Sequence, residues 1–211
     1  MESVHVRVGT DNNFIPTKII KIKGDCEEAC NDCRATVGKG ELGKEPSTKF
    51  KRELLISEHS PIRSISIKWM WDGIASWVAT HFSRHKWECF IKTQRTDRTG
   101  TDRNNLPQGA LVTFTGEANA QHLIDTARKR LCRMASPETR NHMEDLKITL
   151  KQIEPEISDV MVPNCIYRCG CPEPNGCRWY DNAIKRDPKL VSTNIQERYD
   201  AYNDMFYGGN P

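Results

Sequence analysis

The chain of 211 residues lacks any apolar run long enough to cross a membrane, and its first residues lack the basic and hydrophobic segments of a secretory signal. It also lacks a strong charge of one sign, because 31 basic side chains stand against 28 acidic ones. A formal net charge of +3 argues against a protein that coats nucleic acid through a general electrostatic field. We therefore expect a cytoplasmic protein with no membrane partner and no stable nucleic-acid partner, in which local clusters of charge bind any anion.

Cysteine is not scarce, but its pattern argues against a disulfide framework. The nine cysteines are an odd number, and we expect no export signal from the first residues. Cys26, Cys30 and Cys33 have the C-x3-C-x2-C spacing of radical-SAM iron–sulfur sites, but their segment looks like a short helix, so we expect no cluster there. We expect no metal site elsewhere, with structural zinc on four thiols as the alternative. Those four are Cys165, Cys169, Cys171 and Cys177.

Hydrophobic periodicity predicts a mixture of strands and helices. We expect strands at residues 4–8, 19–22, 65–69 and 111–115, the last ended by Gly116. We expect helices at residues 47–56, 74–82, 117–134 and 136–153, the last capped by Ser136. Beyond residue 157 periodic signals are few, so we expect an irregular Cys-rich extension. The predicted division is a main domain at 1–160 and a Cys-rich loop and C-terminal arm at 161–211.

The most informative stretch is basic and polar. Arg84-His85-Lys86 is followed by the segment 93–98, which reads Thr-Gln-Arg-Thr-Asp-Arg. So many cations and hydroxyl groups suit the binding of phosphates and of an electron-rich heterocycle. The stretch resembles the signature of the flavin-dependent thymidylate synthases, which runs Arg-His-Arg, a short spacer and then Ser-x-Arg.

Four further landmarks lie in register with that family: Glu58-His59, Leu106-Pro107, Asn119 at the start of a helix, and Arg130 further along it. The resemblance covers roughly residues 57–155. It implies an α+β fold in which an antiparallel sheet is packed with helices, with residues 1–160 as the catalytic domain. It also implies a homotetramer with FAD at subunit interfaces, methylenetetrahydrofolate as carbon donor and NADPH as reductant.

The resemblance also implies roles for individual residues. Arg130 contacts the pyrimidine and favours its deprotonated form, and Arg103 binds the nucleotide phosphate. His85 lies between two cations, so we expect it to stay neutral and to donate a hydrogen bond to the cofactor. The implied cofactor-binding residues are His59, Pro61, Arg84, His85, Lys86, Asn119, Gln121 and Asp125. The implied substrate-binding residues are His81, Thr93, Gln94, Arg95, Thr96, Arg98, Arg103 and Arg130.

Some neighbouring residues are expected to have no role in the site. Arg128, on the helix that carries Arg130, is expected to be solvated, and its removal to be mild. His122 and His142 are expected at the surface.

The chain departs from the family around the expected ligands. Lys86 replaces an arginine and lacks the planar fork that grips a phosphate with two bonds. The counterpart of Ser-x-Arg is either residues 93–95 or residues 96–98. His81 stands where the family has glutamine, and Asp125 where it has asparagine.

Three functions follow as hypotheses. The first is methylation of dUMP to dTMP, which is the family's commonest activity. The second is hydroxymethylation of dUMP or dCMP. The residues that differ from the family lie where they would exclude or admit a water molecule beside the flavin. The third is a non-enzymatic nucleotide- or nucleic-acid-binding module that stacks bases on tryptophans, although their spacing favours core packing. The tryptophans concerned are Trp69, Trp71, Trp77 and Trp87.

Overall fold

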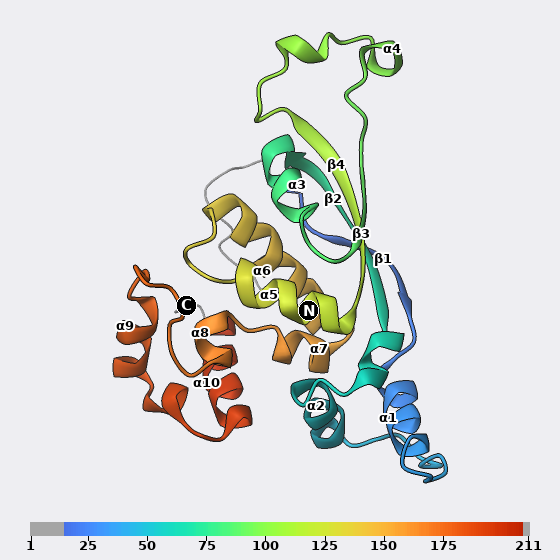
Figure 1. Ribbon diagram of the computed structural model, residues 1–211, viewed down its shortest axis with the longest axis vertical. Helices are drawn as coiled ribbons and strands as arrows, with labels where there is room; N and C mark the ends of the chain where they lie inside the picture. Colours follow the sequence, from blue (N-terminus) through green and yellow to red (C-terminus); the bar gives the residue numbers. More distant parts are fainter. Residues whose placement is uncertain (1–14, 209–211) are drawn as a thin grey trace.

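The computed structural model describes residues 15–208, which form a four-stranded sheet covered by helices (Figure 1). The strand predicted at residues 4–8 lies outside the described residues. The strands pair in the order β1-β2-β4-β3, and every neighbouring pair is antiparallel. This confirms the predicted α+β class. The strands are β1 (Lys18–Lys23), β2 (Ser66–Ala75), β3 (Glu88–Ile91) and β4 (Leu111–Asn119).

The predicted helices are present, the one expected at 117–134 being shorter, and short helices that were not predicted occur before residue 153 and further helices after it. The α-helices are α1 (Cys26–Ala35), α2 (Thr48–Ile56), α3 (Ser76–Phe82), α4 (Thr96–Thr99), α5 (Ala120–Arg130), α6 (Pro137–Lys151), α7 (Pro155–Val160), α8 (Asn164–Tyr167), α9 (Trp179–Arg186) and α10 (Ile195–Tyr207). The 3-10 helices are η1 (Ser60–Ser64), η2 (Arg103–Asn105) and η3 (Pro188–Val191). Among residues 15–208, no helix is both long and apolar enough to cross a membrane.

One face of the sheet is buried, and the other is largely exposed. Along β2 the side chains alternate, and Ile67, Trp69 and Trp71 are fully buried. The ring of Trp71 lies 4.6 Å from that of Phe82 in α3 and 5.3 Å from that of Phe114 in β4, centroid to centroid. Trp69 and Trp71 are therefore core residues, and neither can stack a base for the binding-module hypothesis.

Gly116 does not end a strand, which corrects the prediction. β4 continues through it to Asn119. Gly116 pairs with Trp69 of β2, and the indole of Trp69 occupies the space where a side chain at residue 116 would lie. A Cβ atom at residue 116 would lie 2.5 Å from Cζ2 of Trp69. The glycine is thus required by a close approach between two strands. Similarly, Asp72-Gly73 forms an irregularity within β2, with Gly73 at φ +72°, and α3 begins only at Ser76.

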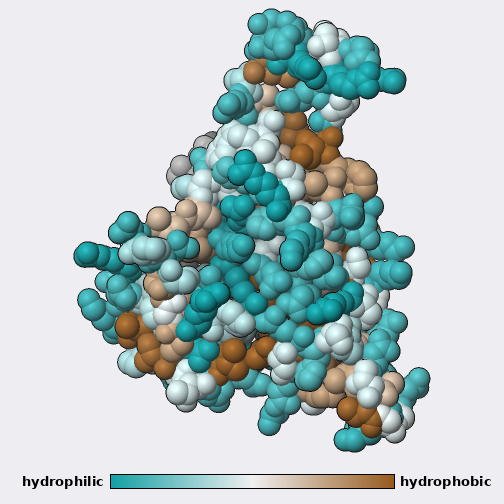
Figure 2. All heavy atoms as spheres, viewed as in Figure 1, coloured by the Kyte–Doolittle hydropathy of each residue, from teal (hydrophilic) through white to brown (hydrophobic). Residues whose placement is uncertain are grey.

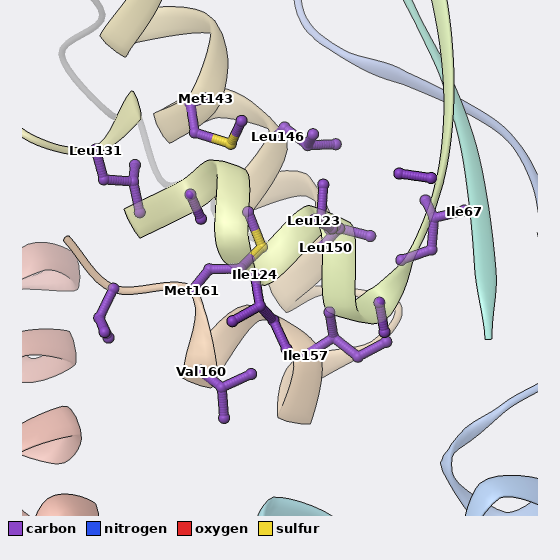
Figure 3. Packing of buried hydrophobic residues seen from close by; sticks show 14 of the residues in the cluster. Ile67, Leu123, Ile124, Leu131, Met143, Leu146, Leu150, Ile157, Val160 and Met161 are labelled. Carbon is purple, nitrogen blue, oxygen red and sulfur yellow. The ribbon is translucent and has the colours of Figure 1, made fainter. Parts of the chain in front are cut away.

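α5, α6 and α7 pack together beneath the sheet through aliphatic side chains (Figure 3). Ser136 caps α6 by accepting a hydrogen bond from the backbone N–H of Thr139, and Pro137 occupies the first turn, as predicted. This packing fixes the direction of α5, whose last residue is Arg130. The side chains in the contact include Leu123, Ile124, Met143, Leu146, Leu150, Ile157, Val160 and Met161.

The C-terminal region differs in part from the predicted irregular extension. The Cys-rich stretch 168–178 is irregular, but α9, η3 and α10 follow it. α10 is anchored by Arg198, which donates hydrogen bonds to the carbonyl oxygens of Ile166, Tyr167 and Ser192. Buried Lys147 of α6 donates to Asn203 of α10 at 2.8 Å. Most of these contacts join residues more than 30 positions apart, which local periodicity cannot reveal. The division at residue 160 stays a prediction.

Candidate active site

Arg130, at the end of α5, is hydrogen-bonded to α3 and to the segment that follows it. Its Nε donates to Nε2 of His85 at 2.7 Å, and its Nη2 donates to the backbone oxygen of His81 at 3.0 Å. The His81 ring lies 3.3 Å, Nδ1 to Oγ1, from buried Thr139 of α6. The structure therefore brings together three of the predicted site residues: Arg130, His85 and His81.

The hydrogen bond from Arg130 defines the state of His85. A guanidinium Nε–H can only donate, so Nε2 of His85 must be unprotonated, and the ring proton lies on Nδ1. Burial, together with the charges of Arg130 and Lys129, lowers the pKa of His85 to about 4. His85 is thus neutral at pH 7, as the sequence predicted, and its Nδ1–H is its donor.

Arg130 is a half-buried cation without a counter-ion in the described part of the chain. Burial and the nearby charge of Arg84 lower its pKa, although a guanidinium remains charged at neutral pH. None of the carboxylates at residues 15–208 forms an ion pair with it. Its remaining N–H groups, those of Nη1 included, can therefore bind an anionic or electron-rich ligand.

Arg128 is buried, which corrects the expectation of a solvated side chain. Its guanidinium pairs with Glu58, donates to Asp125 Oδ1 at 3.0 Å, and lies 3.6 Å from the ring centroid of Tyr167. Gln121 Nε2 donates to Glu58 Oε2 at 2.6 Å. Burial raises the pKa of the Glu58 carboxyl, but the bonds from Arg128 and Gln121 outweigh this effect and hold the pKa below its usual value. This network joins the chain before η1 to α5 and α8.

The predicted flavin-lining residues Gln121 and Asp125 are members of this network. Their polar atoms are bonded within the chain: Gln121 Nε2 donates to Glu58 and to Asp125, and Asp125 accepts from Arg128. Asn119 caps α5, accepting from the backbone N–H of His122 at 2.9 Å, which confirms that it opens the helix. All three predicted roles in cofactor binding stay predictions.

The predicted cofactor residues lie in two places. His59 and Pro61 lie at the start of η1, which contacts α5, while Arg84, His85 and Lys86 follow α3. Glu58, next to His59, joins the first group to Gln121 and Arg128 of α5, and the hydrogen bond from Arg130 to His85 joins the second group to the end of α5. Arg84 and Lys86 are exposed.

The predicted phosphate-binding residues lie on a segment that projects from the sheet. Residues 92–110 connect β3 to β4 through α4 and η2 and extend away from α5 (Figure 1). Arg95 is bound to Asp97 by two hydrogen bonds, of 3.0 and 2.8 Å. The structure does not bring this segment to Arg130 within one chain. The predicted residues on the segment are Thr93, Gln94, Arg95, Thr96, Arg98 and Arg103.

Apolar side chains lie exposed at the base of the projecting segment. Phe90 and Ile91 on β3 are 62% and 40% exposed, and Leu111 at the start of β4 is 68% exposed. Figure 2 shows a hydrophobic area directly below the hydrophilic tip. The short strand β3 was missed from sequence because its four residues do not alternate in polarity.

The cysteines carry no metal site in the described residues. No group of three or more His, Cys, Asp or Glu side chains between residues 15 and 208 is arranged to hold a metal ion. Cys26, Cys30 and Cys33 lie in α1, which is the predicted helix, capped by Asp25. Burial raises the pKa of Cys26 to about 12 and that of Cys30 to about 11, so both are packed, protonated thiols.

One further side chain differs from its sequence-based interpretation, and a cavity lies beside Arg130. His142 is buried against Trp71, with ring centroids 5.4 Å apart, rather than lying at the surface. Arg133 contributes to a cavity beside Arg130, together with residues of the Cys-rich stretch. The basic end of the helix was the only sequence signal for this cavity.

The fold is similar to that of a solved enzyme. A crystal structure of the UMP/dUMP methylase PolB from Streptomyces cacaoi, bound with 5-Br dUMP, superposes on the chain with a TM-score of 0.56. The similarity covers 68% of this chain and 93% of the methylase, at 12% sequence identity. No family model matches the chain, and no curated protein matches it by sequence. At this identity the similarity establishes the fold alone.

Proposed function

We propose that the chain is an enzyme that transfers a one-carbon unit to C5 of a pyrimidine nucleotide. Two independent observations support the proposal: the fold similarity to a UMP/dUMP methylase and the sequence signature around Arg84. The observation that carries it is the position of Arg130, a half-buried cation that is oriented by His85 and by the carbonyl of His81 and has no carboxylate partner in the described chain.

Arg130 supplies the electrostatic contribution that this chemistry needs. C5 of a pyrimidine attacks a carbon donor more readily when the ring is deprotonated, because the negative charge spreads to C5. A guanidinium beside the ring favours that form and stabilises the charge. The bonds to His85 and His81 hold Arg130 in place before the substrate arrives, so little reorganisation is needed during the reaction.

We propose FAD, methylenetetrahydrofolate and NADPH as the cofactor, the carbon donor and the reductant. FAD, once bound and reduced by NADPH, would supply the hydride. Arg84 and Lys86 are exposed and have no ion-pair partner among residues 15–208, so they suit its phosphates, and His85 can donate from Nδ1. Gln121 and Asp125 are engaged with Glu58 and Arg128, so we propose that they shape the wall of the site.

We further propose that the site is completed by another copy of the chain in a homotetramer. The cations of the projecting segment, including Arg103, lie far from Arg130 of their own chain but extend outward, where a neighbouring copy can meet them. The exposed Phe90, Ile91 and Leu111 supply apolar surface for such a contact. In this arrangement Arg103 binds the phosphate of the nucleotide whose ring contacts the neighbour's Arg130.

We place methylation of dUMP to dTMP first and hydroxymethylation of dUMP or dCMP second. His81 favours the second. Burial and the charges of Arg130 and Arg84 lower its pKa, which favours a neutral imidazole whose ring nitrogen can accept a hydrogen bond from water. The hydrogen bond of 3.3 Å between Nδ1 of His81 and Oγ1 of Thr139 orients the ring.

Release of the C5 hydrogen of dUMP tests the proposed reaction class. Substitution at C5 must release this hydrogen whether the product is methylated or hydroxymethylated. We expect tritium from C5-labelled dUMP to appear in water with the three cofactors present, and Arg130→Gln to lower the rate by about a hundredfold. Arg186→Gln on α9, which makes the same change of charge outside the site, should keep the rate. No release by the folded, flavin-loaded protein with either dUMP or dCMP would refute the proposal.

A further inference from the structure

A cavity of about 880 Å³ lies between the end of α5 and the Cys-rich stretch. Residues 128–135 form one wall, residues 171–181 form another, and side chains of α8 and α10 close it. This volume is in the range of sites for small molecules. Because Arg130 lines the cavity, it is continuous with the candidate active site.

The charge of the cavity is positive. Four cations of the wall, Lys129, Arg130, Arg133 and Arg178, have no ion-pair partner in the described chain. Two carboxylates of the wall, Glu173 and Asp181, also form no ion pair. Of the other charged members of the wall, Arg128 is compensated by Glu58, and Glu144 pairs with Arg140 and also lies close enough to Arg133 to feel its charge.

The remaining lining adds no opposing charge. Burial raises the pKa of Cys132, and raises that of Cys165 to about 12, so these two thiols are neutral at pH 7. Trp179 contributes an indole, and the guanidinium of Arg133 lies 5.8 Å from its ring centroid. The wall therefore combines cations with a flat apolar surface, which suits a planar group that carries negative charges.

One backbone feature supports a functional role for this wall. Arg178 has φ +56° and ψ 8°, a left-handed conformation that is unfavourable for a residue with a side chain. Such conformations persist where the surroundings hold them, and they cluster at ligand sites. Here the conformation brings Arg178 to the cavity at the start of α9.

We propose that this cavity binds a planar ligand carrying at least two negative charges, with Arg133 and Arg178 as its anion-binding residues. A pyrimidine nucleotide with a chain of phosphates and a folate with a polyglutamate tail share this chemistry. The inference rests on the proposed function, because both ligands belong to that reaction or resemble its substrates. It adds a second anion site, in the same chain as Arg130, to the phosphate site proposed on the projecting segment.

Calorimetric titration of the full chain tests the site without requiring turnover. The probes are dUTP and folate triglutamate, each titrated at low and at moderate salt, since screening weakens such binding. Each variant, Arg133→Gln or Arg178→Gln, removes one cation from the wall. Arg186→Gln removes an exposed cation from α9 that does not line the cavity and serves as the matched control.

We expect saturable binding of one probe, weakened about tenfold by Arg133→Gln and by Arg178→Gln and less than twofold by Arg186→Gln. The probe that binds shows whether the ligand of the cavity is a nucleotide or a folate. Unchanged binding in both cavity variants, absence of binding by both probes, or an equal loss in the control would overturn the inference. Release of the C5 hydrogen with unchanged probe binding would refute only the cavity site, whereas weakened probe binding without release would refute only the proposed reaction.

Discussion

Arg130 donates from Nε to Nε2 of His85 at 2.7 Å, so the last residue of α5 is bound to the segment after α3 by a neutral histidine. This relationship predicts a pH dependence. An unfolded chain protonates His85 below its usual pKa of 6.5, but the folded chain keeps it neutral down to about pH 4. The folded state therefore binds fewer protons in this window, and its free energy of unfolding falls as pH drops from 6.5 towards 4.

Urea denaturation at several pH values checks this prediction. His85→Gln keeps an acceptor for Arg130 but does not titrate, so we expect its pH dependence to be smaller by about 1–2 kcal/mol, allowing for partial exposure. His142, whose pKa burial also lowers to about 4, accounts for a remaining slope in the same window. If the free energy of unfolding depends on pH equally in wild type and His85→Gln, the lowered pKa of His85 in the folded state is contradicted.

Removal of Arg128 should destabilise the fold. Arg128→Met leaves Glu58 half-buried without its cation, at an expected cost of about 2–3 kcal/mol in the free energy of unfolding. Adding Glu58→Gln removes the carboxylate that has lost its partner, so the double variant should recover part of the lost free energy of unfolding. Chemical denaturation of the four proteins measures this coupling. If the free energy of unfolding of Arg128→Met lies within about 0.5 kcal/mol of wild type, Arg128 is a solvated side chain after all.

Gly116→Ala should be strongly destabilising because three ring atoms of Trp69 lie within 2.9 Å of the added Cβ. Overpacking a buried contact of this kind costs about 1–3 kcal/mol. Gly109→Ala is the matched control, since nothing lies within 4 Å of its Cβ and its backbone has no positive φ. Thermal melting should separate the two variants by several degrees. Equal melting temperatures would show that Trp69 can move aside.

A site shared between chains predicts complementation. Arg130→Gln and Arg103→Gln should each abolish most turnover alone, while co-expressed mixed oligomers recover activity, because some sites then combine two intact residues. The readout is release of the C5 hydrogen by purified mixed oligomers. A mixture that stays as inactive as its parents, although it forms heteromers by mass spectrometry, would contradict the shared site.

The sequence predicted what depends on neighbours along the chain. The helix expected at 136–153 is observed at Pro137–Lys151, since its cap, its proline and its apolar spacing are all local. Gly116 misled the prediction because its role is set by Trp69 on another strand. The arrangement of α10 was missed for the same reason, as its buried face meets Lys147 of α6.

The candidate site shows the same limit. His85 was predicted to be neutral from the cations around it, and burial beside Arg130 gives that result. The sequence could not distinguish Arg128 from Arg130, because the difference depends on Glu58 and Tyr167, which reach α5 from distant segments. Charge near a helix end is visible in the sequence, but its burial and its partners come from tertiary packing.

The mass of the product shows directly whether the protein transfers a one-carbon unit to a pyrimidine nucleotide. The protein is incubated with FAD, NADPH and methylenetetrahydrofolate, and with dUMP or dCMP in separate reactions, and the nucleotides are then weighed by mass spectrometry. We expect dUMP to gain the mass of one CH2 group. A gain of CH2O, or turnover of dCMP alone, would replace methylation of dUMP by hydroxymethylation or by a cytosine substrate. An unchanged mass of both nucleotides with the folded, flavin-loaded protein would contradict one-carbon transfer itself.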